Sequence, residues 1–572
     1  PTRAPAESGG RPVCGRTSGT AVKKALRVAE PATRVGEKVA RRVRLQGHVQ
    51  GVGFRPFVYR LACQHGIGGH VQNQLGEVEV VAVGEIEIVE RFTHDLIACA
   101  PPLSSPALAA VESMDVPEVD GFEIIESLAN AEAQVFVPPD YFMCDACRHE
   151  LQDPADRRHA YPFINCTQCG PRYTLMEALP YDRANTSMKG FPLCPECEAE
   201  YLDPADRRFH AEPVACAKCG PQLSFVEQGA ATVEETNTAL ARAVAAISAG
   251  DVVAVKGIGG YHLVCDAHNE EAVARLRDRK RRPHKPLAVM FPVAGDDGLD
   301  VARESVALTD EEAEIAAGPI RPIVLATRQA ACTLARNVAP GLDEIGVFLP
   351  YSPLHQLLLD AFGGPVVATS GNISGEPVLT DNEEAEHRLK AVADAFLQHN
   401  RPIVRPADDP VYRRIAGRMR PLRIGRGCAP SELSLPWTQS EPLLAVGGHM
   451  KGTVALSWDR RVVVSPHIGE MDSPRSLDVF EQVASDLQAL YGVRATRVVS
   501  DAHPGYTTNR WAQRRSRLPV ETVWHHDAHA SAVAAEYAND RDWLMFAWDG
   551  VGPVSYTHLR AHETNPCISY AV

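Results

Sequence analysis

The sequence predicts a multidomain protein built from α/β and α+β domains. Its 572 residues suffice for about four domains of ~150 residues each. Stretches with helical and strand periodicity alternate through most of the chain, which favours mixed α/β architecture. One segment rich in paired cysteines interrupts the alternation and indicates metal-binding modules.

Composition and charge disfavour several classes of protein. Hydrophobic residues make up 45% of the chain and charged residues 23%, which is typical of a soluble globular protein. No apolar run has membrane-spanning length and no signal-like segment opens the chain, so we expect a cytoplasmic protein without a membrane partner. The net charge of −14 gives no broad basic field, so we do not expect a nucleic-acid partner.

Periodicity and composition divide the chain into six segments. The first and last lack an apolar period, and the four between them are the expected domains. The segments are a disordered leader (residues 1–40), a small α/β sandwich (41–128), tandem cysteine modules (134–228), a mixed α/β domain (236–430), a further α/β segment (440–552) and an atypical tail (553–572).

A glycine-punctuated loop follows the first predicted strand. It reads Gly47-His-Val-Gln-Gly-Val-Gly-Phe-Arg55 and leads into a stretch with helical spacing. Glycines let backbone N–H groups converge on an anion there, and Arg55 can hold two phosphate oxygens. A plain turn with a surface arginine is the alternative, but Gly69-His-Val-Gln-Asn73 follows at the distance of a neighbouring strand. Together they resemble the acylphosphatase signature, which implies that Arg55 binds phosphate and Asn73 orients the attacking water.

The cysteine segment contains an internal repeat with a period of fifty residues. Each copy has the spacing C-x2-C-x18-C-x2-C around an Asp-Pro-Ala-Asp-Arg-Arg motif, and such pairs suit tetrahedral zinc better than a redox site. We therefore predict two structural zinc ions, whose removal unfolds the segment. Spacing leaves open whether each ion is held within one repeat or shared across both. The ligands are Cys144, Cys147, Cys166, Cys169, Cys194, Cys197, Cys216 and Cys219.

The third domain combines a basic run with a polar strand end. The run from Arg275 to Lys285 has seven basic residues in eleven positions, and Val366-Val-Ala-Thr-Ser370-Gly-Asn372 reads as a strand that ends in a hydroxyl and an amide. A solvated basic face is the alternative, but cations beside a polar strand end suit a nucleoside triphosphate.

These segments resemble the YrdC-type domain that forms carbamoyl adenylates. The resemblance implies that a carbamate oxygen attacks the α-phosphate of ATP and that Mg²⁺ assists. The implied nucleotide-binding residues are Lys280, Arg282, Ser370 and Asn372, with Lys256 as a further wall of the pocket.

The last α/β segment carries His525 and His529. On a helix these two residues share a face, so they can bind one further metal ion, and a structural pair is the alternative. Asp549-Gly-Val-Gly552 follows an apolar run and reads as a phosphate-facing turn after a strand. The segment resembles the TsaD family, which implies part of an actin-type ATPase fold, and its expected second lobe is missing, so we expect a C-terminally truncated chain.

The order of the four signatures, from about residue 41 to 552, is similar to that of the HypF-type carbamoyltransferases of NiFe-hydrogenase maturation. The resemblance implies hydrolysis of carbamoyl phosphate at Arg55 and Asn73, followed by adenylation of the carbamate with ATP. It also implies transfer of the carbamoyl group to the C-terminal cysteine of a partner protein, HypE, for cyanide ligand synthesis.

Two other functions remain open at this stage. A threonylcarbamoyl-adenylate synthase that acts in tRNA modification would share the third and last domains, but it has no use for an acylphosphatase domain. A zinc-dependent nucleic-acid-binding protein would share the cysteine modules, but the net charge of −14 opposes it.

Overall fold

The computed structural model describes residues 38–49, 52–74, 77–101, 103–125, 136–179, 181–537, 543–549 and 567–571. The chain divides into two compact units, of which the first ends at Phe136 and the second begins at Val137. The predictions for residues 1–37, the glycines of the turn after Asp549 and most of the tail lie outside the described residues. None of the described helices has the length and apolar character that crossing a bilayer requires.

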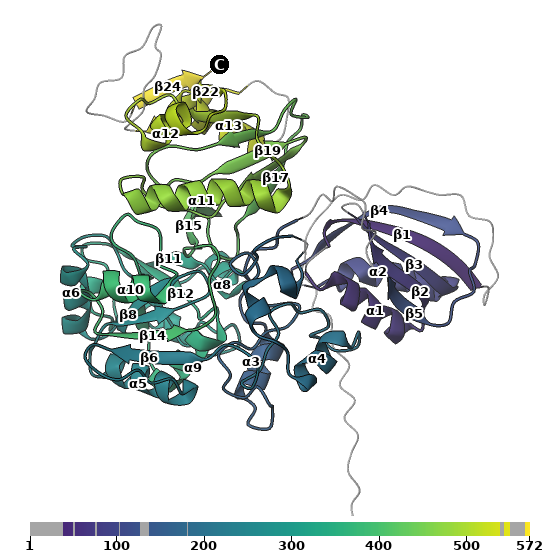
Figure 1. Ribbon diagram of the computed structural model, residues 1–572, viewed down its shortest axis with the longest axis horizontal. Coiled ribbons are helices and arrows are strands. Elements are labelled where there is room, and N and C mark those ends of the chain that lie inside the picture. Colours follow the sequence, from purple (N-terminus) through teal and green to yellow (C-terminus); the bar gives the residue numbers. More distant parts are fainter. Residues whose placement is uncertain are drawn as a thin grey trace, which may run out of the picture. The chain divides into compact units, whose positions relative to one another are not determined.

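The first unit is the predicted α/β sandwich. Its five-stranded sheet has the order β4-β1-β3-β2-β5, in which β2 and β5 are parallel and the other neighbours antiparallel. Helices α1 and α2 cover one face of the sheet (Figure 1). The elements are β1 (Lys38–His48), α1 (Phe54–His65), β2 (Gly68–Asn73), β3 (Val78–Glu85), α2 (Ile86–Ala98), β4 (Ser105–Met114) and β5 (Phe122–Ile125).

The start of α1 is set by a glycine. Gly53 precedes the helix with φ of 72°, a left-handed conformation that side chains disfavour. The helix buries Phe54, Val58 and Leu61 against the sheet, at the spacing expected of an amphipathic helix. Arg55 therefore lies in the first turn of α1. The backbone N–H groups of a first turn have no hydrogen-bond partner within the helix.

The cysteine modules open the second unit. In both copies the first cysteine is the N-cap of a short helix and the second lies in the first turn, so local structure creates the close pair. The modules share a buried core with the following domain, in which Cys147 and Cys169 belong to one cluster with Phe348. The elements are α3 (Asp145–Gln152), η1 (Arg183–Asn185), η2 (Ser187–Gly190) and α4 (Pro195–Leu202).

A large mixed sheet forms the next domain. Its order is β16-β15-β11-β12-β9-β13-β8-β7-β14-β6, and β10 pairs with β11. The strands are β6 (Leu223–Glu227), β7 (Val253–Lys256), β8 (Tyr261–Asp266), β9 (Ala288–Met290), β10 (Val306–Ala307), β11 (Ile323–Arg328), β12 (Glu344–Phe348), β13 (Val366–Ser370), β14 (Ala395–His399), β15 (Val411–Ile415) and β16 (Arg418–Arg423). The helices are α5 (Thr236–Ser248), α6 (Glu270–Arg279), α7 (Asp300–Arg303), α8 (Asp310–Ala317), η3 (Arg336–Val338), α9 (Pro353–Phe362) and α10 (Asn382–Leu389).

Both faces of this sheet are buried. Along β7, Ala254 packs into one core, while Val253 and Val255 pack into the core shared with the cysteine modules. Successive residues of a strand point to opposite faces, so a continuous apolar run is what a doubly covered strand requires. Lys256 at the end of β7 is opposite Tyr261, and Ser370 at the end of β13 is opposite His262. Tyr261 and His262 both begin β8, so the ends of β7 and β13 lie at the same edge of the sheet.

The last domain has a six-stranded sheet in the order β17-β20-β19-β18-β21-β22. Helix α11 packs most of its buried residues into the core that this sheet forms. The elements are β17 (Ser431–Ser434), β18 (Leu443–Ala445), β19 (Ala455–Trp458), β20 (Arg461–Val464), α11 (Pro474–Tyr491), β21 (Arg497–Asp501), α12 (Thr507–Arg515), β22 (Val520–Val523) and α13 (His525–Tyr537), followed by β23 (Met545–Asp549) and β24 (Cys567–Ala571). The last two strands pair with each other, so part of the predicted tail is a strand.

Candidate active sites and metal centres

The first unit positions Arg55 and Asn73 on adjacent elements. Arg55 lies in the first turn of α1, Asn73 is the last residue of β2, and α1 contacts β2. The Oδ1 of Asn73 is buried and has no hydrogen-bond partner among the described residues. A buried acceptor in this state is able to hold a water molecule.

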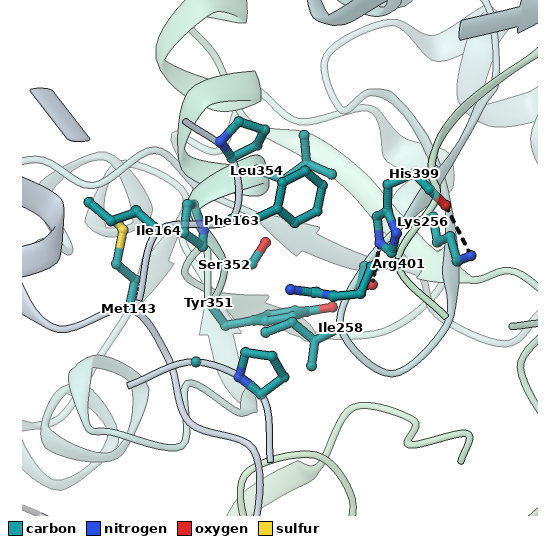
Figure 2. Close-up of a pocket in the computed structure, with 15 residues that line it drawn as sticks. Met143, Phe163, Ile164, Lys256, Ile258, Tyr351, Ser352, Leu354, His399 and Arg401 are labelled. Atoms are coloured by element: carbon teal, nitrogen blue, oxygen red, sulfur yellow. Dashed lines mark hydrogen bonds between the residues drawn. The ribbon is translucent and has the colours of Figure 1, made fainter. Parts of the chain in front are cut away.

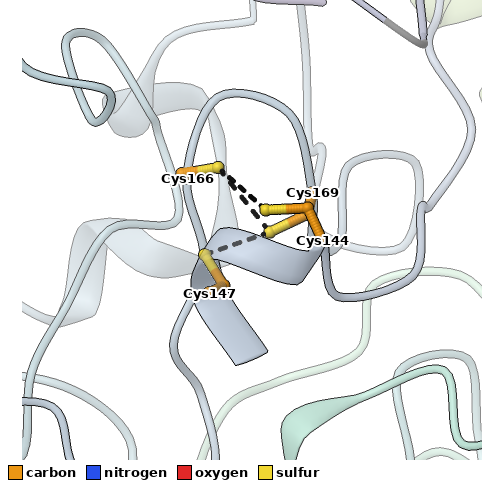
Figure 3. Close-up of side chains that lie close together, drawn as sticks. All are labelled: Cys144, Cys147, Cys166 and Cys169. Atoms are coloured by element: carbon orange, nitrogen blue, oxygen red, sulfur yellow. Dashed lines mark hydrogen bonds between the residues drawn. The ribbon is translucent and has the colours of Figure 1, made fainter. Parts of the chain in front are cut away.

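The eight predicted zinc ligands form two groups, and each group comes from one repeat. Cys144, Cys147, Cys166 and Cys169 form the first, and Cys194, Cys197, Cys216 and Cys219 form the second. Figure 3 shows the four sulfurs of the first group facing a common centre. The spacing of the sequence left open a shared arrangement, and the structure resolves this in favour of one site per repeat.

The sulfur positions fit tetrahedral zinc. In the first group the Sγ atoms of Cys144 and Cys166 are 3.7 Å apart, and those of Cys169 and Cys147 are 3.5 Å apart. The second group has corresponding separations of 3.7 and 3.7 Å. Four Zn–S bonds of about 2.3 Å in tetrahedral geometry require sulfur separations of about 3.8 Å. Both groups therefore suit closed, structural zinc sites, and no other group of three or more close ligands occurs in the described part of the chain.

Arginines of each repeat contact the cysteines of the other repeat. Arg207 donates to the Sγ of Cys147 at 3.2 Å, and Arg158 donates to the Sγ of Cys197 at 3.4 Å. These arginines come from the repeated Asp-Pro-Ala-Asp-Arg-Arg motif, whose role the sequence alone does not indicate. The two sites are thus joined by reciprocal hydrogen bonds to ligand sulfurs.

Two partly buried carboxylates, Glu150 and Glu200, complete this arrangement. Glu200 pairs with Arg157 at 2.7 Å and Arg158 at 2.5 Å, and Glu150 pairs with Arg207 at 2.7 Å. Burial raises the pKa of Glu200, but hydrogen bonds from the two arginines outweigh it and bring the pKa to about 2. The arginine positions are therefore fixed by ion pairs that persist at neutral pH.

In the third domain the basic run meets the polar strand end. Lys280, at the end of α6, donates to the carbonyl of Ser370 at 2.5 Å and to the Oδ1 of Asn372 at 2.8 Å. The hydroxyl of Ser370 donates to the same Oδ1 at 2.9 Å. Burial, together with the charge of Arg282, lowers the pKa of Lys280 to about 7.

Arg282 extends this cationic cluster. Its Nη1 donates to the hydroxyl of Thr369 at 3.0 Å, and burial lowers its pKa to about 10. Burial also lowers the pKa of Lys285. Among the ion pairs of the described residues, none joins Lys280, Arg282 or Lys285 to a carboxylate, and the nearby Asp408 pairs with Arg423 at 2.6 Å. A bound polyphosphate would supply the negative charge that this cluster lacks.

Lys256 makes different contacts. Its ammonium donates to the Oδ1 of Asn382 at 2.6 Å and to the carbonyl of His399 at 3.3 Å. These bonds direct Lys256 towards α10 and β14, whereas Lys280 turns towards Ser370. Sequence reasoning missed Thr369, because only the order of the strands brings this hydroxyl next to Arg282.

The last domain gathers its histidines at the carboxyl ends of parallel strands. β18, β21 and β22 are parallel neighbours, and His525 begins the helix after β22. The Nδ1 of His525 lies 2.5 Å from the Oδ2 of Asp501, and its ring centroid is 4.9 Å from that of His529. The pair shares a helix face as predicted, while a metal ion there stays a prediction. Ligand sites in open α/β sheets commonly occupy such strand ends.

Comparisons with known proteins assign each of the four expected domains to a family. The matching family models are Acylphosphatase at residues 41–124, HypF finger at 143–176 and 193–226, Telomere recombination at 245–425 and HypF Kae1-like domain at 438–536. The Carbamoyltransferase HypF of Synechocystis is 46% identical, over 89% of this chain and 66% of its own length. A crystal structure of full-length HypF in the phosphate- and nucleotide-bound form is 40% identical, covers 91% of this chain and 68% of that chain, and has a TM-score of 0.81.

The fold and the sites define a multidomain protein that joins an acylphosphatase domain, paired four-cysteine modules and a YrdC-like domain on one chain. The chain belongs to the HypF carbamoyltransferase family. It spans about two thirds of the length of the curated relatives that it matches. The Threonylcarbamoyl-AMP synthase of Vibrio parahaemolyticus, by contrast, is 30% identical over only 27% of this chain.

Proposed function

We propose that this protein is an ATP-dependent carbamoyltransferase with acylphosphatase activity that acts in NiFe-hydrogenase maturation. One observation carries the proposal. Buried Lys280 and partly buried Arg282 form a cationic cluster without a paired carboxylate in the described residues, on the same chain as an acylphosphatase domain. A phosphate-releasing site and a nucleotide site on one chain suit a reaction whose intermediate is unstable in water.

The proposed chemistry has three steps. Water held by Asn73 attacks the phosphorus of carbamoyl phosphate, whose phosphate is bound by Arg55, the bond between phosphorus and the carbamoyl oxygen breaks, and carbamate leaves as inorganic phosphate forms. A carbamate oxygen then attacks the α-phosphorus of ATP, the bond to the leaving pyrophosphate breaks, and carbamoyl adenylate forms. Finally a thiolate of the acceptor attacks the carbamoyl carbon and AMP departs. Lys280, Arg282 and bound Mg²⁺ would stabilise the negative charge of the phosphates in the second step.

Cofactors and partner follow from the same proposal. Two zinc ions are structural, ATP and carbamoyl phosphate are substrates, and the C-terminal cysteine of HypE is the acceptor thiol. We place the reaction in the cytoplasm, because zinc binding by four cysteines needs reduced thiols. His525 and His529 would lie at the site of the transfer step. We also propose a metal ion at this pair, although the described residues contain no group of three close ligands there.

The proposal is tested by two variants with separate readouts. Arg55→Ala should lower phosphate release from carbamoyl phosphate by at least ~100-fold, since a charge-stabilising contact is lost. Lys280→Ala should lower carbamoyl-phosphate-dependent pyrophosphate release far more than phosphate release. Equal phosphate release by Arg55→Ala and the unmodified protein would remove the first site from the scheme.

A further inference from the structure

A cavity lies where the first cysteine module meets the large sheet of the second unit. Phe163 of the module lines one side, Tyr351 and Ser352 line the start of α9, and Lys256, His399 and Arg401 come from the ends of β7 and β14. Figure 2 shows the guanidinium of Arg401 extending towards the centre of this group, between Phe163 and Tyr351. The lining contains two basic residues and no carboxylate, and the ammonium of Lys256 is directed towards the carbonyl of His399, away from the centre of the group.

Arg401 is a buried cation that forms no ion pair among the described residues, and buried Asp140 is the carboxylate whose charge acts on it. It is 5% exposed, and its Nε has no hydrogen-bond partner among the described residues. Its guanidinium carbon lies 5.1 Å from the centre of the Phe163 ring, a contact that does not neutralise the charge. Burial lowers its pKa to about 10, so the side chain remains protonated at neutral pH. Buried charges in proteins are normally paired, and an anion in the cavity would provide the pair.

His399 supplies a neutral acceptor to the same cavity. Its Nε2 is 3.2 Å from the carbonyl of Gly257, which assigns the ring proton to Nε2 and leaves Nδ1 as an acceptor. That Nδ1 is buried and accepts no hydrogen bond among the described residues, and the backbone of Arg401 also lies beside the ring. Burial also lowers the pKa of His399 well below its usual range, so the imidazole is neutral. A ligand that bears both an anionic oxygen and an N–H group satisfies Arg401 and His399 together.

We propose that this cavity binds a small planar oxyanion of the carbamate class, with its carboxylate oxygens on Arg401 and its N–H on the Nδ1 of His399. The existence of the anion site rests on the cavity alone, whereas its occupation by carbamate rests on the proposed function. Lys256 in the cavity wall and Ser370 of the cationic cluster lie at the same edge of the sheet, with only β8 between their strands. The site would hold carbamate away from bulk water beside the adenylation site and so slow its decomposition.

The anion site is tested by thermal unfolding of the full chain with sodium formate, freshly dissolved ammonium carbamate, or sodium chloride at equal ionic strength. Formate and carbamate should raise the unfolding temperature more than chloride, because a ligand stabilises the state that binds it. Arg401→Met should raise the half-saturating concentration of both anions at least ~10-fold, while Arg279→Met, which removes an arginine paired with Asp394, should leave it unchanged. His399→Leu should weaken carbamate more than formate.

Two results of this experiment would overturn the anion site. One is an unchanged response of Arg401→Met to formate. The other is an equal rise in the unfolding temperature of the unmodified protein with formate and with chloride. Arg401→Lys, which keeps the charge but loses the planar fork, should retain a weaker response. A response equal to that of Arg401→Met would show that charge plays no part.

The role of carbamate is tested separately, by the ratio of pyrophosphate to phosphate formed from ATP and carbamoyl phosphate. Arg401→Met should lower this ratio several-fold, and ammonium carbamate added from solution should restore pyrophosphate formation. An unchanged ratio would overturn the carbamate role while the anion site stands. Absence of pyrophosphate with the unmodified protein would instead contradict the proposed function, and the formate experiment would still decide the site.

Discussion

The Nη2 of Arg207 lies 3.2 Å from the Sγ of Cys147, although the two residues belong to different copies of the repeat. The reverse contact joins Arg157 of the first copy to the Sγ of Cys197 in the second at 3.4 Å. A four-thiolate zinc site carries a net charge of −2, so a guanidinium at a sulfur stabilises the loaded site. Each repeat therefore supplies part of the charge compensation for the zinc site of the other.

These contacts between the repeats predict the effect of Arg207→Ala on zinc binding. Loss of the guanidinium should weaken zinc binding at the first cysteine group by about 10-fold to 100-fold, because outer-shell contacts contribute to affinity on this scale. Arg157→Ala should weaken the second group instead. Competition with a chromophoric chelator, followed as two release phases, measures both effects.

Arg148 provides the matched control for that experiment. It is next to Cys147 in sequence, but its guanidinium forms an exposed ion pair with Asp145 at 3.0 Å. Exposed pairs of this kind contribute little to stability, so Arg148→Ala should release zinc as the unmodified protein does. Equal zinc release by Arg207→Ala and Arg148→Ala would show that the sulfur contact has no energetic role.

Metal removal should increase the flexibility of the cysteine modules and also of the large sheet domain that packs against them. Cys147 and Cys169 share a buried cluster with Phe348 and Leu358 of the large sheet domain. Since binding and folding of structural zinc sites are coupled, chelation should increase amide exchange in residues 143–226 and in the strands and helix packed against them. Cys169→Ser should reproduce this increase, while Cys332→Ser, outside both sites, should not. Unchanged exchange after complete metal removal would contradict the coupling.

The lowered pKa of Lys280 predicts a pH dependence of nucleotide binding. Burial holds this pKa at about 7, so the folded protein loses the charged form of Lys280 as pH rises through 7. The unfolded chain keeps the proton up to the ordinary lysine pKa, so folding stability should rise with pH between these two values. ATP binding favours the charged lysine, so affinity should fall by up to ~10-fold per unit as pH rises above about 7.

Calorimetry with Lys280→Arg isolates this effect. Arginine stays charged throughout the range, so the variant should lose the dependence centred near pH 7. Lys256, whose pKa burial lowers to about 8, should still contribute a dependence at higher pH in both proteins. Parallel curves for the variant and the unmodified protein would rule out titration of Lys280 as the cause.

The sequence was most informative where structure is local. The pairs Cys144–Cys147 and Cys194–Cys197 were readable because one helix turn sets their spacing. The α/β sandwich and the family resemblance are confirmed by the fold and by the comparisons. The domain boundaries were expectations, and β1 begins at Lys38, slightly before the expected start.

The remaining features depend on how distant segments meet. Fifty-residue periodicity is compatible with zinc sites inside or across repeats, so only tertiary structure could assign the sites. Arg207 and Cys147 are sixty residues apart, and no local pattern links them. Arg401 follows β14 as a single basic residue without a motif, and its significance comes from burial and from the absence of a paired carboxylate among the described residues.

In the proposed function, carbamoyl phosphate supplies the group that ATP activates on this chain. Release of AMP and pyrophosphate from ATP, measured with carbamoyl phosphate and with threonine plus bicarbonate, distinguishes this chemistry from tRNA modification. We predict release that requires carbamoyl phosphate and is lost in Lys280→Ala. Release that occurs only with threonine and bicarbonate would contradict the account and assign the protein to tRNA modification.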